Sequence, residues 1–179
     1  HVTGKLFGPY LHRPQQLLEQ DGDRLYQASQ QLKHDGLVQK IGVSIYEPAE
    51  LDALCSRYQF DIVQAPFNIM DRRLIDSGWL SRLAEQGTEL HVRSVFLQGL
   101  LLMTPSDRPK KFNRWASLWS KWENWLKHTG LTPLQACLRY ALSFSQISKV
   151  IVGVDSLPQL KEILLAAAGS SPQIPDGLS

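Results

Sequence analysis

Short apolar runs rich in β-branched residues alternate with longer amphipathic stretches from residue 37 onward. This alternation is typical of β-strands and α-helices that build a parallel sheet. Four runs predict strands, and these are Val38 to Ser44, Phe60 to Gln64, Leu90 to Val95 and Lys149 to Val152. A fifth run, Lys5 to Leu11, contains a proline, which cannot donate to a strand ladder, so it predicts an edge strand or a bulge.

Helical spacing of apolar positions predicts a helix after each clear strand and one before the first. The predicted helices are Asp23 to His34, Glu47 to Tyr58, Leu74 to Glu85, Pro133 to about Ser143, and Leu157 to Ala168. An additional helix near 113–128 carries Trp115, Trp119, Trp122 and Leu126 on one face. We expect this aromatic face to pack in the core, and a stacking platform for a ligand is the alternative. Residues 169–179 are predicted to be a flexible tail.

Parallel βα repeats allow an open doubly wound sheet or part of a (β/α)8 barrel. A complete barrel takes about 250 residues, and this chain of 179 residues supplies about five βα units. No glycine-rich G-x-G-x-x-G loop follows the first strand, which disfavours a dinucleotide fold of that type. The sequence therefore predicts an α/β fold in which residues 1–168 form one unit.

Composition excludes several classes of protein and of partner. Hydrophobic residues make up 43%, charged residues 20%, and the net charge of +2 comes from dispersed basic and acidic residues. These values exclude whole-chain disorder, and they give nucleic acid no concentrated basic surface. Cys55 and Cys137 lack the spacing of a disulfide framework or a metal site, so we expect no metal and a reducing, cytoplasmic environment. No apolar run is long enough to span a membrane, so we expect no membrane partner.

The predicted strand ends carry short polar motifs in a fixed order. They are Tyr10-Leu11-His12-Arg13-Pro14, Ile41-Gly42-Val43-Ser44, Val63 to Asn68, Ser94 followed by Gln98-Gly99-Leu100-Leu101, and Val152 to Leu160. Together these motifs resemble the C-terminal five-eighths of an aldo-keto reductase, from its fourth barrel strand to its eighth. The Gly-Val-Asp-Ser motif at the last strand is similar to members found in surface-polysaccharide and sugar-nucleotide pathways. The resemblance implies an incomplete (β/α)8 TIM barrel.

The resemblance also implies an activity, the NAD(P)H-dependent reduction of an aldehyde or ketone. His12 matches the histidine of the family's Asp/Tyr/Lys/His tetrad, which holds the substrate carbonyl while negative charge develops on its oxygen. That histidine position is the one candidate catalytic residue in the chain. The alternative is a histidine that only hydrogen-bonds a loop.

Three further positions match the family's contacts to the nicotinamide. Ser44 and Gln64 match the residues that bind the carboxamide, a planar group that needs both donors and acceptors. Ser94 matches the serine at the end of the seventh strand. Two positions depart from the family pattern, because Ile45 replaces a common Asn and Arg93 replaces an aromatic residue that stacks on the nicotinamide ring. A guanidinium plane can also stack on a ring.

Gly153, Asp155 and Gln159 match the region that binds the adenosine phosphate. The family usually has a basic or hydroxyl residue at the position of Asp155. Because a carboxylate repels a 2′-phosphate and can accept from a ribose hydroxyl, the match favours NADH modestly over NADPH. An N-cap for the following helix is an equal interpretation of Asp155.

The family's catalytic Asp, Tyr and Lys belong to strands that this sequence does not contain. We therefore predict that the chain alone has little carbonyl reductase turnover, because the lysine normally lowers the pKa of the proton-donating tyrosine. An incomplete barrel exposes strand edges, which we expect self-association or the missing N-terminal segment to cover. The alternatives are a non-catalytic truncated barrel that binds a nucleotide or serves in assembly, and an unrelated α/β protein whose motifs match by chance.

Overall fold

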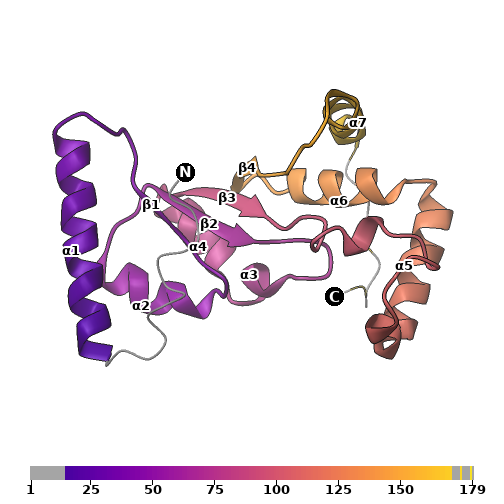
Figure 1. Ribbon diagram of the computed structural model, residues 1–179, viewed down its shortest axis with the longest axis horizontal. Coiled ribbons are helices and arrows are strands. Elements are labelled where there is room, and N and C mark those ends of the chain that lie inside the picture. Colours follow the sequence, from indigo (N-terminus) through magenta and orange to yellow (C-terminus); the bar gives the residue numbers. More distant parts are fainter. Residues whose placement is uncertain (1–14, 171–173, 175–177, 179) are drawn as a thin grey trace.

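The computed structural model describes residues 15–170, 174 and 178, and strands and helices alternate through that part of the chain (Figure 1). The predicted strand Lys5 to Leu11 lies outside the described residues. The elements in chain order are α1 (Gln15–His34), β1 (Gly42–Ser44), α2 (Ala49–Arg57), β2 (Ile62–Pro66), α3 (Arg73–Asp76), α4 (Trp79–Glu85), β3 (Glu89–Arg93), η2 (Leu100–Leu102), η3 (Lys110–Trp115), α5 (Ala116–Thr129), α6 (Pro133–Leu142), β4 (Ile147–Val150) and α7 (Leu157–Ala167).

The four described strands form one parallel sheet in the order β1-β2-β3-β4. Strands that follow each other in sequence are neighbours, as in a (β/α)8 barrel, whereas a doubly wound sheet reverses its order at a switch point. Gly42 lets β1 approach β2, because a Cβ at that position would lie 2.5 Å from the backbone oxygen of Ile62. The fold is therefore α/β and corresponds to part of a (β/α)8 barrel.

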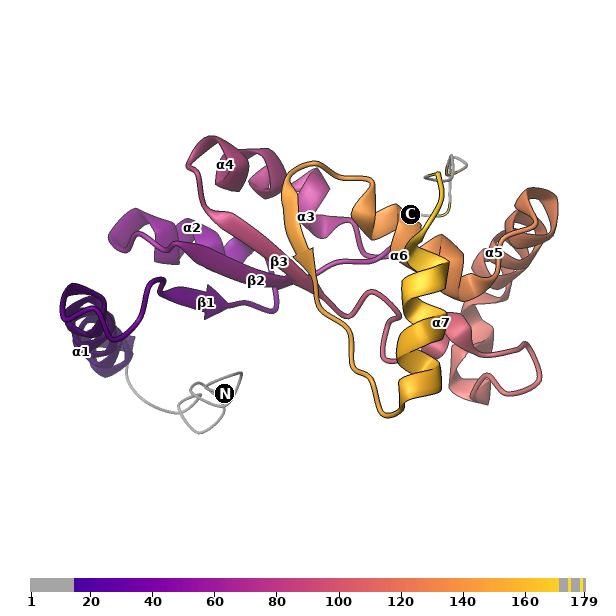
Figure 2. The same ribbon diagram turned by 90° about the horizontal axis from the view of Figure 1, so that it is seen from above.

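The two faces of the sheet differ in burial. Val63 and Ala65 of β2 and Leu90 and Val92 of β3 are fully buried, and α2, α3 and α4 lie on one side of the sheet (Figure 2). Alternate residues on the same strands point to the opposite face and are only partly buried. In a barrel the helix-covered face is the outer one, so the half-buried polar side chains belong to the inner face.

The tryptophan-rich segment is mostly core. Its residues form η3 followed by α5, and Trp119, Trp122 and Trp125 are buried. This burial confirms the prediction that the aromatic face packs inside the protein. Trp115 differs, because it precedes α5 and is 39% exposed.

The predicted strand Val38 to Ser44 is wrong in its first half. After α1, Gly36 adopts a left-handed φ of 71°, and the N–H groups of Leu37 and Val38 donate to the carbonyl of Leu32. Residues that wrap around a helix end in this way cannot extend into the sheet at the same time. The strand therefore begins only at Gly42.

Two predicted helices also have different bounds. Leu74 to Glu85 is divided into α3 and α4, because Gly78 adopts a φ of 76° between them. The helix predicted from Asp23 begins at Gln15 and passes through Gly22, although glycine inside a helix costs about 1 kcal/mol. A Cβ at Gly22 would lie 3.0 Å from the hydroxyl of Tyr58, so the glycine lets α1 pack closely there.

The C-terminal stretch is described at only a few positions beyond Ser170. Leu178 is 1% exposed and belongs to the hydrophobic core. Ile174 is partly buried and packs against this core. The other residues after 170 lie outside the described part of the chain, so the flexible tail stays a prediction for them.

Candidate functional site

The sheet brings two of the predicted site residues into direct contact. Ser44 ends β1, and Gln64 is its register partner on β2. The Ser44 hydroxyl donates to Oε1 of Gln64 over 3.3 Å. The Gln64 Nε2 donors and the lone pairs of the serine oxygen remain for a ligand, which is the combination that a carboxamide needs. The carboxyl ends of parallel barrel strands are also where the active sites of such folds lie.

Arg93 extends from the end of β3 to Ile45, the residue that follows Ser44. One Nη2–H donates to the backbone oxygen of Ile45 over 2.9 Å, and Nη1 lies 3.3 Å from the hydroxyl oxygen of Ser94. The guanidinium carbon is 5.1 Å from the centre of the Tyr46 ring. The side chain therefore crosses the end of β2 at Pro66, which is the register partner of Arg93, and joins the ends of β1 and β3.

The segment after β3 has a strained backbone. Ser94, Leu97 and Gln98 have φ values of 60°, 48° and 56°, a left-handed conformation that side-chain-bearing residues rarely adopt. Each such residue costs on the order of 1 kcal/mol or more, and such strain is typical of functional sites. The strain at Ser94 also explains why β3 ends at Arg93, two residues before the predicted end at Val95.

Asn68 supports the strained segment and was not predicted as a functional residue. It is 1% exposed, and its Nδ2 donates to the backbone oxygen of Ser94 over 3.2 Å. Its Oδ1 accepts from the N–H groups of Met70 and Asp71, each over 3.0 Å. The side chain therefore connects the loop after β2 to the loop after β3. The only feature of the sequence that could have indicated this role is the position of Asn68 at the end of the strand-end motif, directly after Phe67.

The remaining predicted cofactor contacts lie around the start of α7. The N-cap of α7 is Ser156, whose hydroxyl accepts from the Gln159 N–H over 3.3 Å. The interpretation of Asp155 as N-cap is therefore wrong, because a serine one position later takes that role. The Asp155 N–H donates to Gln159 Oε1 over 2.7 Å, and Gly153 has open space where a Cβ would lie. Within the described residues, we find no hydrogen bond that joins this loop to Ser44, Gln64 or Ser94.

His12, the predicted catalytic residue, lies outside the described residues, so its position relative to Ser44 and Gln64 stays a prediction. In the described part of the chain, no group of three histidine, cysteine, aspartate or glutamate side chains could hold a metal ion. None of the described helices combines the length and the apolar character that crossing a bilayer requires.

Neither cysteine is a good candidate nucleophile. Burial raises the pKa of the Cys137 thiol to about 12, so this side chain stays protonated inside the core. Burial is also the main cause that raises the pKa of Cys55, although nearby Arg82 acts in the opposite direction. Reactive cysteines need a lowered pKa, so the candidate chemistry does not involve these thiols.

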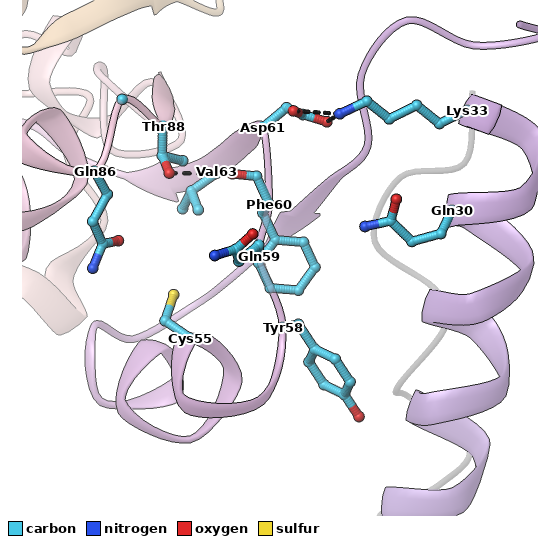
Figure 3. A pocket seen from close by; sticks show the side chains of 11 residues that line it. Gln30, Lys33, Cys55, Tyr58, Gln59, Phe60, Asp61, Val63, Gln86 and Thr88 are labelled. Carbon is cyan, nitrogen blue, oxygen red and sulfur yellow. Dashed lines mark hydrogen bonds and ion pairs between the residues drawn. The ribbon is translucent and has the colours of Figure 1, made fainter.

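A polar cavity of about 430 Å³ lies at the opposite end of the strands, between α1, α2 and the start of β2 (Figure 3). Its lining includes Lys33, Cys55, Tyr58, Asp61 and Gln86. In barrel folds the residues at the amino-terminal ends of the strands contribute mainly to stability, and the reacting groups lie at the carboxyl-terminal ends. We therefore assign the candidate site to the Ser44–Gln64 end and treat this cavity as structural.

Asp61 in this cavity should make stability depend on pH. Its carboxylate accepts from Lys33 Nζ over 2.6 and 2.7 Å and from the Ile41 N–H, and these bonds hold its pKa below the usual value. A lowered folded-state pKa means that the stabilisation is present above the unfolded pKa of about 3.9 and is lost as pH falls through the folded value. We expect Asp61→Asn to lower the free energy of unfolding at pH 7 by about 0.5 to 1 kcal/mol, since the pair is partly exposed.

Urea unfolding of both proteins between pH 3 and pH 8 measures this difference. The difference should stay constant at neutral pH and shrink toward zero below about pH 4. Lys33→Met and the double variant complete a thermodynamic cycle that isolates the ion pair. A difference that is the same at pH 3 and pH 7 would show that the charge of Asp61 is not what stabilises the fold.

One family model matches most of the chain. The profile described as "Aldo/keto reductase family" matches residues 9–171. Over 159 residues, covering 84% of this chain and 51% of the relative, the chain is 25% identical to the uncharacterized oxidoreductase YqkF of Bacillus subtilis (strain 168).

Two solved structures share the fold. The holo form of aldo-keto reductase AKR11C1 from Bacillus halodurans has a TM-score of 0.65 at 20% identity, covering 84% of this chain and 52% of that chain. The thermostable aldo-keto reductase Tm1743, in complex with the inhibitor epalrestat, has a TM-score of 0.58 at 22% identity, covering 79% of this chain and 47% of that chain. The present chain thus spans about half the length of the relatives that it matches.

Proposed function

Because this chain belongs to the aldo/keto reductase family of oxidoreductases, we propose that it provides one side of a nicotinamide site in an enzyme that reduces an aldehyde or ketone with NAD(P)H. The observation that carries the proposal is the hydrogen-bonded pair Ser44 and Gln64 at the carboxyl ends of neighbouring parallel strands. The pair offers hydroxyl and amide groups to a planar carboxamide, and it lies where barrel folds assemble their sites.

The residues of this chain would bind and orient the cofactor. A nicotinamide in this place would supply a hydride to the substrate carbonyl. Ser44 and Gln64 would fix the rotation of the carboxamide and thereby of the ring, while Ser94 follows the neighbouring strand. By resemblance, His12 would donate a hydrogen bond to the carbonyl oxygen, where negative charge develops during reduction.

The proton donor of the reaction is proposed to come from outside this chain. The resemblance assigns that role to a tyrosine assisted by an aspartate and a lysine, and a histidine alone cannot lower a tyrosine pKa as the lysine does. We therefore propose that the 179-residue chain by itself binds cofactor but has little turnover.

Asp155 supports NADH modestly over NADPH as the cofactor. Its carboxylate is exposed near the start of α7, where it would repel a 2′-phosphate and could accept from a ribose hydroxyl. Gly153 and Gln159 shape the same loop. The cytoplasm is the proposed compartment, since Cys55 and Cys137 are both free thiols.

A non-catalytic role in nucleotide binding or assembly is the second candidate. It requires only the Ser44–Gln64 pair and the sheet, without a proton donor. In both cases we propose that the outer edges of β1 and β4 are covered, either by a second copy of the chain or by an N-terminal segment of the barrel. The expected ligand is a small carbonyl compound, with no role for nucleic acid or membrane.

Replacement of Gln64 tests the proposed cofactor site. We expect Gln64→Met, which keeps the length of the side chain, to weaken NADH binding about tenfold, because one or two hydrogen bonds to the carboxamide are lost. Quenching of tryptophan fluorescence by NADH and by NADPH measures the affinity, and the five tryptophans of the chain make this signal strong.

Gln86→Met is the matched control, because Gln86 lines the cavity at the opposite end of the strands. It should leave NADH affinity unchanged. The proposal fails if the wild-type chain binds neither cofactor, or if both methionine variants bind NADH as tightly as the wild-type chain. Binding of NADH without oxidation in the presence of an aldehyde would distinguish a retained half-site from a complete enzyme.

A further inference from the structure

Arg93 is a cation at the candidate site, and none of the described residues is its anionic partner. Two of its N–H groups donate to the Ile45 oxygen and toward the Ser94 hydroxyl, and the guanidinium has further N–H donors that these bonds do not use. In the part of the chain that the structure describes, no carboxylate forms an ion pair with Arg93. A half-buried guanidinium without an anion is costly unless a ligand supplies one.

The acidic residues of the adjacent loops are already engaged. Asp71 forms two hydrogen bonds of 2.8 Å with Arg73, which lowers the pKa of the Asp71 carboxyl. Glu47 lies 3.5 Å from the same arginine. Glu50 accepts from the N–H groups at the start of the β1–α2 loop over 2.8 and 2.7 Å. Arg73 therefore has two carboxylate partners, while the described residues offer none to Arg93.

The position of the guanidinium is fixed. The bond to Ile45 and the nearby Tyr46 ring hold it beyond the carboxyl end of β2, next to the residues that we propose bind the carboxamide. Arginine presents its donors in a planar fork that matches a carboxylate with two parallel hydrogen bonds. An oxyanion bound here would lie beside a carbonyl group that is reduced at the same site.

We propose that Arg93 binds the carboxylate of the substrate, so that the reaction acts on aldehydes or ketones that carry a carboxylate, such as oxo acids. This inference rests on the proposed function, because a carbonyl substrate is assumed at the Ser44–Gln64 site. A phosphate group of the cofactor has the same chemistry, and the experiment separates the two sources.

Oxalate is a suitable probe, since it carries carboxylates and no reducible carbonyl. Its binding to the 179-residue chain is followed by the NMR signal of the Arg93 Nε–Hε group, with and without saturating NADH. We expect oxalate to shift this signal with the same affinity in both conditions. Arg93→Met should weaken oxalate binding at least tenfold, and Arg93→Lys should retain part of it, because lysine keeps the charge without the fork.

Arg73→Met is the matched control, because Arg73 also lies near the carboxyl ends of the strands but already has carboxylate partners. It should leave oxalate binding unchanged, and urea unfolding of each variant verifies that the fold persists. For the methionine variants, oxalate binding is measured by calorimetry under the same conditions.

Three results would overturn the inference. If NADH binds normally and Arg93→Met binds oxalate as tightly as the wild-type chain does, Arg93 does not hold the substrate carboxylate, while the proposed function stays intact. Competition between oxalate and NADH at Arg93, with inorganic pyrophosphate displacing both, would assign the anion to the cofactor. Oxalate binding at Arg93 without any NADH binding would contradict the proposed function, and with it the assignment to a carbonyl substrate.

Discussion

Replacing Phe67 by alanine is expected to lower the free energy of unfolding by about 3 to 5 kcal/mol, the usual range for a buried aromatic side chain. Phe67 is fully buried at the end of β2. Its ring is stacked on Tyr140 of α6, with ring centres 5.4 Å apart and planes 5° apart, and meets the edge of Phe144 at 5.2 Å. The variant would lose these contacts and leave a cavity between the sheet and α6.

Urea unfolding measures this change as a lower midpoint with an unchanged slope. A natural domain has only about 5 to 15 kcal/mol of stability, so this loss would remove a large share of it. Phe67→Leu keeps most of the volume and should cost less. Trp115→Ala removes a larger ring from a partly exposed position and should change the midpoint little. Equal losses for Phe67→Ala and Trp115→Ala would contradict the role assigned to the Phe67 contacts.

Replacing Asn68 by alanine is expected to cost about 1 to 3 kcal/mol, because the Met70 N–H loses its partner and the Ser94 oxygen and the Asp71 N–H each lose one of two hydrogen bonds. Each buried polar group that loses its hydrogen bond costs about 1 to 3 kcal/mol. The Leu97 N–H also donates to the Ser94 oxygen, but that bond lies within the segment, whereas Asn68 connects this oxygen to the loop after β2. We therefore also expect the variant to loosen the segment after β3. Hydrogen exchange of the amides at 94–99 measures that loosening separately from global unfolding.

Asn68→Asp provides the control. Its carboxylate can still accept from the N–H groups of Met70 and Asp71, but it cannot donate to the Ser94 oxygen. We expect the loop after β2 to stay protected while exchange at 94–99 accelerates. If the aspartate variant protects both segments as the wild-type chain does, the bond from Asn68 to Ser94 does not support the strained backbone.

The sequence predicted strands better than it predicted their ends. Short apolar runs rich in β-branched residues around Val63 and Leu90 located β2 and β3, and in the structure every second residue of these strands is buried. The ends depend on local backbone conformation instead. Gly36 turns the chain around the end of α1, and the left-handed φ of Ser94 ends β3. The pattern of hydrophobic residues does not predict either of these backbone conformations.

The candidate site could be predicted where its residues belong to neighbouring strands. Ser44 and Gln64 each come from a strand-end motif, and parallel register alone brings them together. The contact of Arg93 with Ile45 joins residues 48 positions apart across an intervening strand, so the sequence indicated the cation but not its partner. Asn68 is buried by packing between two loops, a long-range effect that no local spacing encodes.

Among the strands that the structure describes, β1 and β4 are the outermost, and their length limits how this sheet can pair with another chain through its backbone. β1 has three residues and β4 has four, so each offers few backbone groups to an incoming strand. Short edges discourage indiscriminate strand addition and fibre growth. A chain that covers these edges as proposed would therefore be held mainly by side chains on the inner face rather than by backbone pairing.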